Sequence, residues 1–520
     1  METKKPMSKA VELKTNGSNA GNFKTNFEPF IRPLAGKGNG YTMVLGATVI
    51  LVGIWLYYCI DMFIHGHALD GTTNYGAIWG ITVAHVVQWI GVSHVGIAIS
   101  ATVRVLRLRH LRNIARLAEL ITIVSMIVAV TNIGLDTGKM GWFIINTVLY
   151  GRWHSPMVWS CTVITLYIFG TSSYLYLSMR RDFWLMSTIA PRWKGFYKAL
   201  AWGYEDTEAE RKRHEITCFW CALPLLPIMV SVHSVYGLFF GMLQSHPGWF
   251  NPLMAPYFVL GAIVTGFSFV ILTMSILRGA YGWKEIFPDK NFQVLGVFLA
   301  FVIALYIYFL WSEMMVGNYA APPLEKATAK SLLTGEFSGM FWFAVITGLF
   351  IPFFYFFRQG LKAKYINVPL SGVVAFLVFL ALYLKRILVV VPAQFTFHIE
   401  SLKEEAIPYS PTFSEQAVTY GTIFWGLLIF LILLKVLPII EMPPEEDEPV
   451  PAGERKNSQR FRYLLVFLTV AGAITMIAWG FSTRQYDYAP VKWLIGILML
   501  VCVPLANCLP KDKLIVKSNQ

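Results

Sequence analysis

Ionisable side chains lie inside long apolar stretches of this chain, where they are rare and costly. The clearest is His233, in SVHSVYGLFFGM, which is followed by a turn without Lys or Arg and a second apolar stretch. It lies about ten residues, or roughly 15 Å, below the outer end of its predicted helix. An imidazole at that depth marks a functional site unless it faces protein or water in a structural role. The alternative is a neutral histidine bonded to a backbone carbonyl of a neighbouring helix.

Other ionisable groups fall within or at the edges of apolar stretches. His94 and Glu119 are predicted near the inner ends of their helices, where they would form a proton path open to the cytoplasm. For Glu119 the alternative is an ion pair with Arg112 or Arg116. Paired cations in a membrane need acidic partners or water. Lys385, Arg386 and their candidate partner Glu313 are further candidates for this proton path or for an ion-pair network. The remaining embedded groups are His85, Asp136 and His154.

Three of these groups are expected at the outer face. Asp136 ends one predicted helix, His154 begins the next, and His233 approaches from a third. An apolar cavity with a few proton-exchanging groups suits a quinone head, and Asp136 and His233 are the predicted proton-transferring residues. Ser160 and Trp249 complete the predicted quinone-binding set. Two histidines at matching depth on facing helices would be needed for a b-type haem, and the spacing does not favour that alternative.

The composition defines the class of protein. The chain has 520 residues, of which 56% are hydrophobic and 14% charged, with a mean hydropathy of +0.54. Such a composition, with apolar runs near twenty residues, predicts an all-α polytopic membrane protein in a lipid bilayer. The net charge of +13 comes from basic residues in alternate loops, so membrane topology explains it and nucleic-acid binding is excluded.

Apolar windows predict about twelve transmembrane helices. Basic residues concentrate in alternate loops, which places both termini in the cytoplasm. The inner loop 180–216 is expected to hold an amphipathic helix on the membrane surface. The predicted spans are 40–60, 77–102, 117–135, 155–179, 217–243, 255–277, 291–311, 339–357, 368–392, 418–440, 463–482 and 493–509.

Five segments follow from these spans. The chain divides into an N-terminal tail (1–39), a ten-helix core (40–440), an acidic, Pro-rich linker (441–461), two additional helices (462–509) and a C-terminal tail (510–520). The tails and the linker are expected in the cytoplasm. Cys218 and Cys221 form a single C-x-x-C at a helix end, so we expect packing and no metal site in this chain.

Several motifs in order resemble one family. SHVGIAISA, RHLRNIARLAELITI, LDTGKMGW, HSPMVWS, SVHSVYGLFFGM, YFLWSEMMVGNY, YLKRILVVV and YSPTFSEQAVTYGTIFWGLLIF are similar to the NrfD and polysulfide reductase type of membrane subunit, especially the large subunits of alternative complex III. The resemblance covers roughly residues 40–440. It implies two four-helix bundles with peripheral helices, in the plasma membrane of a prokaryote.

The resemblance also implies a function and partners. Such a protein carries no cofactor of its own, reacts with menaquinone or another quinone, and docks on an extracytoplasmic iron-sulfur subunit. That partner links it to a molybdopterin-type catalytic subunit or to cytochrome c subunits. A homologous membrane subunit is a further expected partner, and some members translocate protons. The chain alone would then be a subunit of an oxidoreductase and inert by itself.

The chain departs from that subfamily at the expected quinol ligands. It has Asp136 in place of a His, and Ser160 and Phe239 in place of Asp residues. Two readings stay open: a quinone site built from Asp136, His154 and His233, or a structural anchor without quinone chemistry. A secondary transporter is the third, although Pro224 and Pro227 in one half lack a clear counterpart in the other.

Overall fold

The computed structural model describes residues 39–72, 77–105, 111–138, 140–152, 154–189, 193–395 and 409–441, together with residues 33 and 474. These residues form helices joined by loops, without strands. Helices are expected, because in lipid each backbone N–H and C=O must be satisfied within its own segment. The predicted helices 463–482 and 493–509, both tails and nearly all of the linker lie outside the described residues.

Ten spans in the described part are long and apolar enough to cross a membrane. They correspond to the first ten predicted helices, which confirms the all-α polytopic fold. The spans are α2 (Asn39–His65), α3 (Ile81–Val105), α4 (Arg112–Asp136), α6 (Pro156–Ile189), α8 (Glu208–Gly241), α9 (Met254–Tyr281), α10 (Asp289–Tyr319), α12 to α13 (Ser338–Val345, Ile346–Phe350 and Ile351–Leu361), α14 (Val368–Val390) and α16 (Phe413–Val436).

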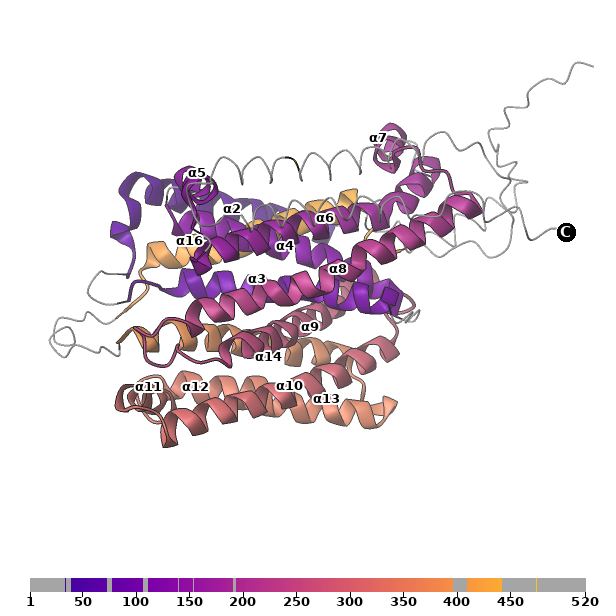
Figure 1. Cartoon of the computed structure of the whole chain (residues 1–520). Helices are drawn as coiled ribbons and strands as arrows, with labels where there is room; N and C mark the ends of the chain where they lie inside the picture. The colour runs from indigo at the N-terminus through magenta and orange to yellow at the C-terminus, as the bar shows by residue number, and fades with distance from the viewer. Residues whose placement is uncertain are drawn as a thin grey trace, which may run out of the picture.

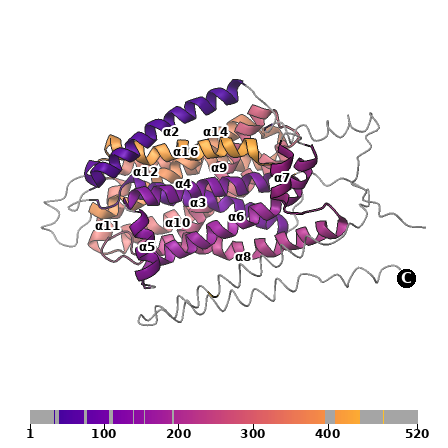
Figure 2. The same cartoon turned by 90° about the horizontal axis from the view of Figure 1, so that it is seen from above.

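These spans pack as two bundles with a shared seam. Helices α3, α4, α6 and α8 form the first bundle, and α9, α10, α12 to α13 and α14 form the second. The seam consists of α3 and α8 against α9, with α14 also reaching α3. Helices α2 and α16 pair with each other and lie against α4, outside both bundles, as Figures 1 and 2 show.

Helix α3 is the most buried of the ten described spans. Small residues allow this, because they let helix backbones approach closely. A side chain at Gly96 would meet Thr122 and the backbone of Ala118 on α4, and one at Gly266 of α9 would meet Val95 on α3. Polar side chains on α3 are therefore held inside protein and away from lipid.

Short helices mark the two ends of the bundle. α5 (Met140–Tyr150) and α11 (Pro323–Leu333) lie at one end, and α7 (Lys194–Ala201) lies at the other (Figure 1). This placement agrees with the predicted alternation of loops, and we call the end with α5 and α11 the outer end. The remaining short helices are η1 (Gly66–Leu69), η5 (Ala363–Tyr365) and η6 (Pro392–Phe395).

The inner segment 180–216 is less of a loop than predicted. Helix α6 continues to Ile189 and α8 begins at Glu208, so α7 alone fills the turn. The extended ends of α6 and α8 include charged residues, because these residues form ion pairs. The side chain of Asp206 is paired with Arg181 at 3.3 Å and with Arg211 at 2.8 Å. A prediction from hydropathy places the end of a helix at its first charged residues. In the structure, these ion pairs and an apolar cluster around Phe183 stabilise the additional turns.

Candidate functional site

Two histidines meet at the seam between the bundles. His94 of α3 and His233 of α8 are both fully buried, with ring centroids 4.5 Å apart and planes at 74°. His94 Nδ1 lies 2.6 Å from the carbonyl oxygen of Ile90, and Nε2 lies 2.7 Å from that of Met229. A neutral imidazole has only one N–H, so only the protonated ring satisfies both carbonyls. In the neutral ring, one of these two contacts therefore lacks a proton.

His233 differs from its neighbour. Neither of its ring nitrogens has a hydrogen-bond partner among the described residues. The alternative of a histidine bonded to a backbone carbonyl therefore applies to His94 and not to His233. Buried polar atoms are nearly always bonded, and an exception calls for water, a ligand or a functional explanation.

A buried arginine lies beside this pair. Arg386 of α14 is 2% exposed, and its guanidinium lies 4.7 Å from the ring centroid of Phe258. A side chain at Gly261 would come within 2.7 Å of Nη2, so the glycine provides space for the guanidinium. The charge of Arg386 acts on both His94 and His233. The middle of the seam is therefore a cationic centre enclosed by apolar side chains.

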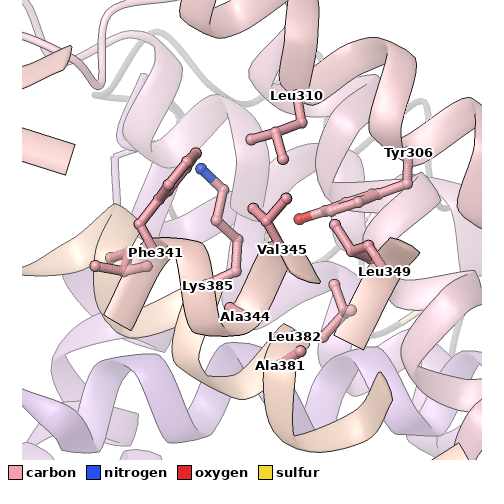
Figure 3. A pocket seen from close by; sticks show the side chains of 10 residues that line it. Tyr306, Leu310, Phe341, Ala344, Val345, Leu349, Ala381, Leu382 and Lys385 are labelled. Carbon is pink, nitrogen blue, oxygen red and sulfur yellow. The ribbon is translucent and has the colours of Figure 1, made fainter. Parts of the chain in front are cut away.

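Lys385 points away from that centre. Its Nζ pairs with Glu313 of α10 at 3.2 Å, as the sequence predicted, and lies 5.7 Å from the ring of Tyr257 and 5.8 Å from that of Phe341. Figure 3 shows the ammonium group beside Phe341, in a hollow between α10, α12 and α14 that Tyr306 also lines. Lys385 is thus paired with a carboxylate and the guanidinium of Arg386 packs on Phe258, while Tyr257 and Tyr306 lie near both cations.

Glu119 lies near the inner end of the first bundle. It is 4% exposed and accepts a hydrogen bond from the hydroxyl of Ser178 at 3.1 Å. Arg116, one turn further in on α4, pairs with Asp182 and donates through Nη2 to the Ser178 carbonyl at 2.9 Å. A polar hollow lined by Arg116, Asp182 and further charged side chains opens beside this group.

Hydroxyl groups continue from Glu119 toward His94. Thr122, three residues from Glu119 on α4, donates to the carbonyl of Ser93 at 2.6 Å, and the hydroxyl of Tyr167 donates to the same oxygen at 2.8 Å. Ser93 precedes His94 in sequence. Polar groups therefore extend from the inner hollow to the central histidines through an otherwise apolar bundle.

Asp136 and His154 lie at the outer end. Asp136 is the exposed last residue of α4, and His154 is exposed in the turn before α6. Tyr236 of α8 interacts electrostatically with Asp136 and with Cys161 of α6, so the outer ends of α4, α6 and α8 are neighbours. His233 lies one turn deeper and is enclosed against His94. Of these three predicted quinone ligands, Asp136 and His154 are thus exposed at the outer end, and His233 is buried beside His94.

The polar atoms of Ser160 and Trp249 are already engaged. Ser160 is buried, and its hydroxyl donates to the Pro156 carbonyl of its own helix at 3.0 Å. Trp249 donates its indole N–H to the Val389 carbonyl at 2.6 Å and stacks on Trp79. Trp249 thereby holds the loop 244–253 on α14. Neither residue has a free donor for a ligand, so their predicted contact would be through apolar atoms.

A polar group near the outer end was not predicted. Glu415 of α16 is 3% exposed and accepts hydrogen bonds from the Tyr409 hydroxyl at 2.5 Å and from the Gly71 backbone N–H at 3.0 Å. Burial and this bond raise the pKa of Tyr409. In sequence, Thr412 and Glu415 have the spacing of a helix cap, and Thr412 does accept the Glu415 N–H. The pattern indicates a cap and gives no sign of the partner Tyr409.

The comparisons with known proteins agree with this architecture. Residues 71–398, more than half of the chain, match the family described as Polysulphide reductase, NrfD. The chain is 26% identical over 449 residues to a putative membrane C subunit of dimethyl sulfoxide reductase from Halobacterium salinarum, covering 82% of this chain and 97% of that protein. It is 24% identical over 421 residues to the C subunit of selenate reductase from Mesobacillus selenatarsenatis, covering 78% of this chain and 95% of that protein. The chain belongs to the NrfD family of polysulphide reductase membrane proteins.

Proposed function

We propose that this protein is the quinone-reactive membrane subunit of a respiratory oxidoreductase complex, which exchanges electrons between membrane quinone and an extracytoplasmic iron-sulfur subunit. The observation that supports this most is similarity over nearly the full length of two proteins named as C subunits of reductases. Their names differ in substrate, so the common element is the type of membrane protein and not the substrate. A molybdopterin-type or cytochrome partner would complete the complex.

The outer ends of α4, α6 and α8 offer groups that fit a quinone head. A quinone needs hydrogen-bond donors at its oxygens and a group that exchanges protons. His154 and the Tyr236 hydroxyl are donors, and Asp136 is an exposed carboxylate whose surroundings include the charges of His67 and Glu415. Bound there, quinone would supply two-electron, two-proton redox chemistry, and Asp136 would accept or return the proton.

The buried polar groups support a coupled proton path. Glu119, Thr122 and Tyr167 are polar groups between the inner hollow and His94, and Arg386 places a positive charge beside that histidine. Such groups are costly in a membrane interior and mark ion or proton pathways in other membrane proteins. In this proposal Lys385 and Glu313 form an ion pair that stabilises α14 against α10.

A structural anchor is the second candidate. Two positions that carry Asp in the resembling quinone-binding subunits hold Ser160 and Phe239 here, and the Ser160 hydroxyl is bonded to its own helix. An anchor would hold the iron-sulfur partner at the membrane without exchanging electrons with quinone. Loss of bound quinone with partners retained distinguishes it from the first proposal.

Purification with partners tests both. The protein is isolated in mild detergent with whatever binds it, and quinone and iron are measured in the same sample. Asp136→Asn should release most of the quinone and leave the iron. Asp61→Asn is the matched control, because Asp61 is an outer-end carboxylate of α2 paired with His65. Iron without quinone in the unchanged protein would contradict the first proposal and support the anchor.

A further inference from the structure

A second histidine of α3, His85, has a geometry that fixes its protonation. His85 is 1% exposed, and its Nε2 accepts the indole N–H of Trp89 at 2.9 Å. An indole nitrogen only donates, so Nε2 carries the lone pair and the proton of the neutral ring is on Nδ1. No described residue lies within hydrogen-bond distance of Nδ1. His85 therefore has a buried N–H donor without a hydrogen-bond partner among the described residues.

Two amide oxygens nearby are also without partners. Gln88 donates through Nε2 to the Phe379 carbonyl at 3.1 Å, and Asn132 donates through Nδ2 to the Val128 carbonyl at 2.9 Å. Carbonyl partners fix the orientation of each amide, so Gln88 Oε1 and Asn132 Oδ1 are acceptors. Neither oxygen has a partner among the described residues, and both side chains are at most 1% exposed.

These atoms belong to one region between α3, α4, α14 and α16. His85 and Asn132 both contact the Thr422 hydroxyl, at 3.2 and 2.8 Å, and Gln88 lies one turn from His85 on α3. The rings of Tyr383 and Tyr420 lie edge-on to His85, with centroids 5.6 and 5.9 Å away. One donor and two acceptors match the hydrogen bonds of water, which accepts from N–H and donates to amide oxygens.

We propose that His85, Gln88 and Asn132 hold a cluster of buried water and that this water forms the outer part of a proton route opening at Asp136. Asn132 and Asp136 are four residues apart on α4 and so lie on one face, one turn apart. The titratable and charged groups around the route include Asp136, Glu415, His67 and Asp70 at the outer end, and Tyr383, Tyr420 and Tyr409 on the side of His85. His85 positions the water and does not relay the proton, because Trp89 occupies its second nitrogen. The water site does not depend on the proposed function, whereas the proton route rests on it.

Hydroxyl-radical footprinting of the purified complex tests the water site directly. Radiolysis of bound water oxidises adjacent side chains, so Tyr383 and Tyr420 should be labelled several-fold more than Tyr167. Tyr167 is a fully buried reference whose hydroxyl is bonded to a backbone carbonyl, whereas Tyr383 and Tyr420 are half-buried, so the change in their labelling in the variants below decides the question. Labelling no greater than that of Tyr167 would overturn the proposal.

Variants then test which atoms hold the water. Asn132→Leu and Gln88→Met should each lower the labelling of Tyr383 and Tyr420 in otherwise folded protein. Asn113→Leu is the control on α4, since its amide donates to the Ile286 carbonyl near the inner end. Unchanged labelling in both site variants would contradict the assignment. Footprinting needs no turnover, so its outcome is independent of the quinone proposal.

Proton release tests the route. The complex is reconstituted in vesicles, and a pH indicator on the outer side measures protons released per quinol oxidised. Asn132→Leu should reduce that ratio several-fold, while Asn113→Leu leaves it unchanged. A ratio that Asn132→Leu does not alter would overturn the route and leave the water as structural. Absence of any quinone-linked turnover in the unchanged complex would instead refute the proposed function.

Discussion

Replacing His233 tests whether this histidine has a functional or a structural role. Its two ring nitrogens are fully buried without described partners, and each buried group left unbonded costs about 1–3 kcal/mol. His233→Leu removes both at nearly constant volume. It also removes the ring contacts with His94 and Phe258, worth about 0.5–1.5 kcal/mol each. The midpoints of these ranges give a gain of about 2 kcal/mol in stability, and we expect it together with loss of quinone-linked proton coupling.

His94→Leu is the paired variant and should behave in the opposite way. His94 contacts two backbone carbonyls at 2.6 and 2.7 Å, so its removal should cost about 1–3 kcal/mol. Equilibrium unfolding in mixed micelles of mild detergent and SDS gives both stabilities on one scale. Proton uptake per electron in vesicles gives the function of each variant.

Two results would refute this reasoning. If His233→Leu were less stable than the unchanged protein, the ring would have bonds that the structure does not show. If it were more stable and fully coupled, the unbonded nitrogens would have no role in proton movement. The expected combination is a stability gain with a functional loss, as is typical when a site keeps a costly group for its chemistry.

Two further changes test packing and charge. Asp182→Asn removes the anion from the buried pair with Arg116 and should cost about 3–5 kcal/mol in the same unfolding assay. Glu441→Gln, at a more exposed pair, should cost about 1 kcal/mol or less, and equal losses would contradict the role of burial. Gly237→Ala places a methyl group 2.6 Å from the α9 backbone and should destabilise by about 1–3 kcal/mol. Gly279→Ala meets nothing within 4 Å, and because Ala has a higher helix propensity than Gly it should be neutral or slightly stabilising, so a comparable loss there would contradict crowding as the cause.

Much of the fold could be predicted because lipid imposes a simple rule. Apolar length identifies each span, and ten of the predicted helices are present in the described residues. The ends were less predictable. Helices α6 and α8 extend beyond their predicted ends, where Asp206 pairs with Arg181 and Arg211, because an ion pair between distant residues has no local signature.

The site divides in the same way. The sequence identified His94, His233, Arg386 and Glu119 as embedded groups, and it matched Lys385 with Glu313. It did not identify Gln88, Asn132 or Tyr409, because these side chains carry no charge and their burial depends on partners distant in sequence. The outer grouping of Asp136 with His154 and the role of each as a quinone ligand stay predictions.

The sequence by itself determined which residues enter the membrane, because transfer of a segment into lipid depends on its own composition. It also determined that any ionisable group there must face protein. Only the tertiary structure decided the partners, since these depend on which helix faces lie together. It placed His94 between two carbonyls while leaving His233, 4.5 Å away, without a bond. That difference arises from the packing of α3 against α8 and α9, which no single helix contains.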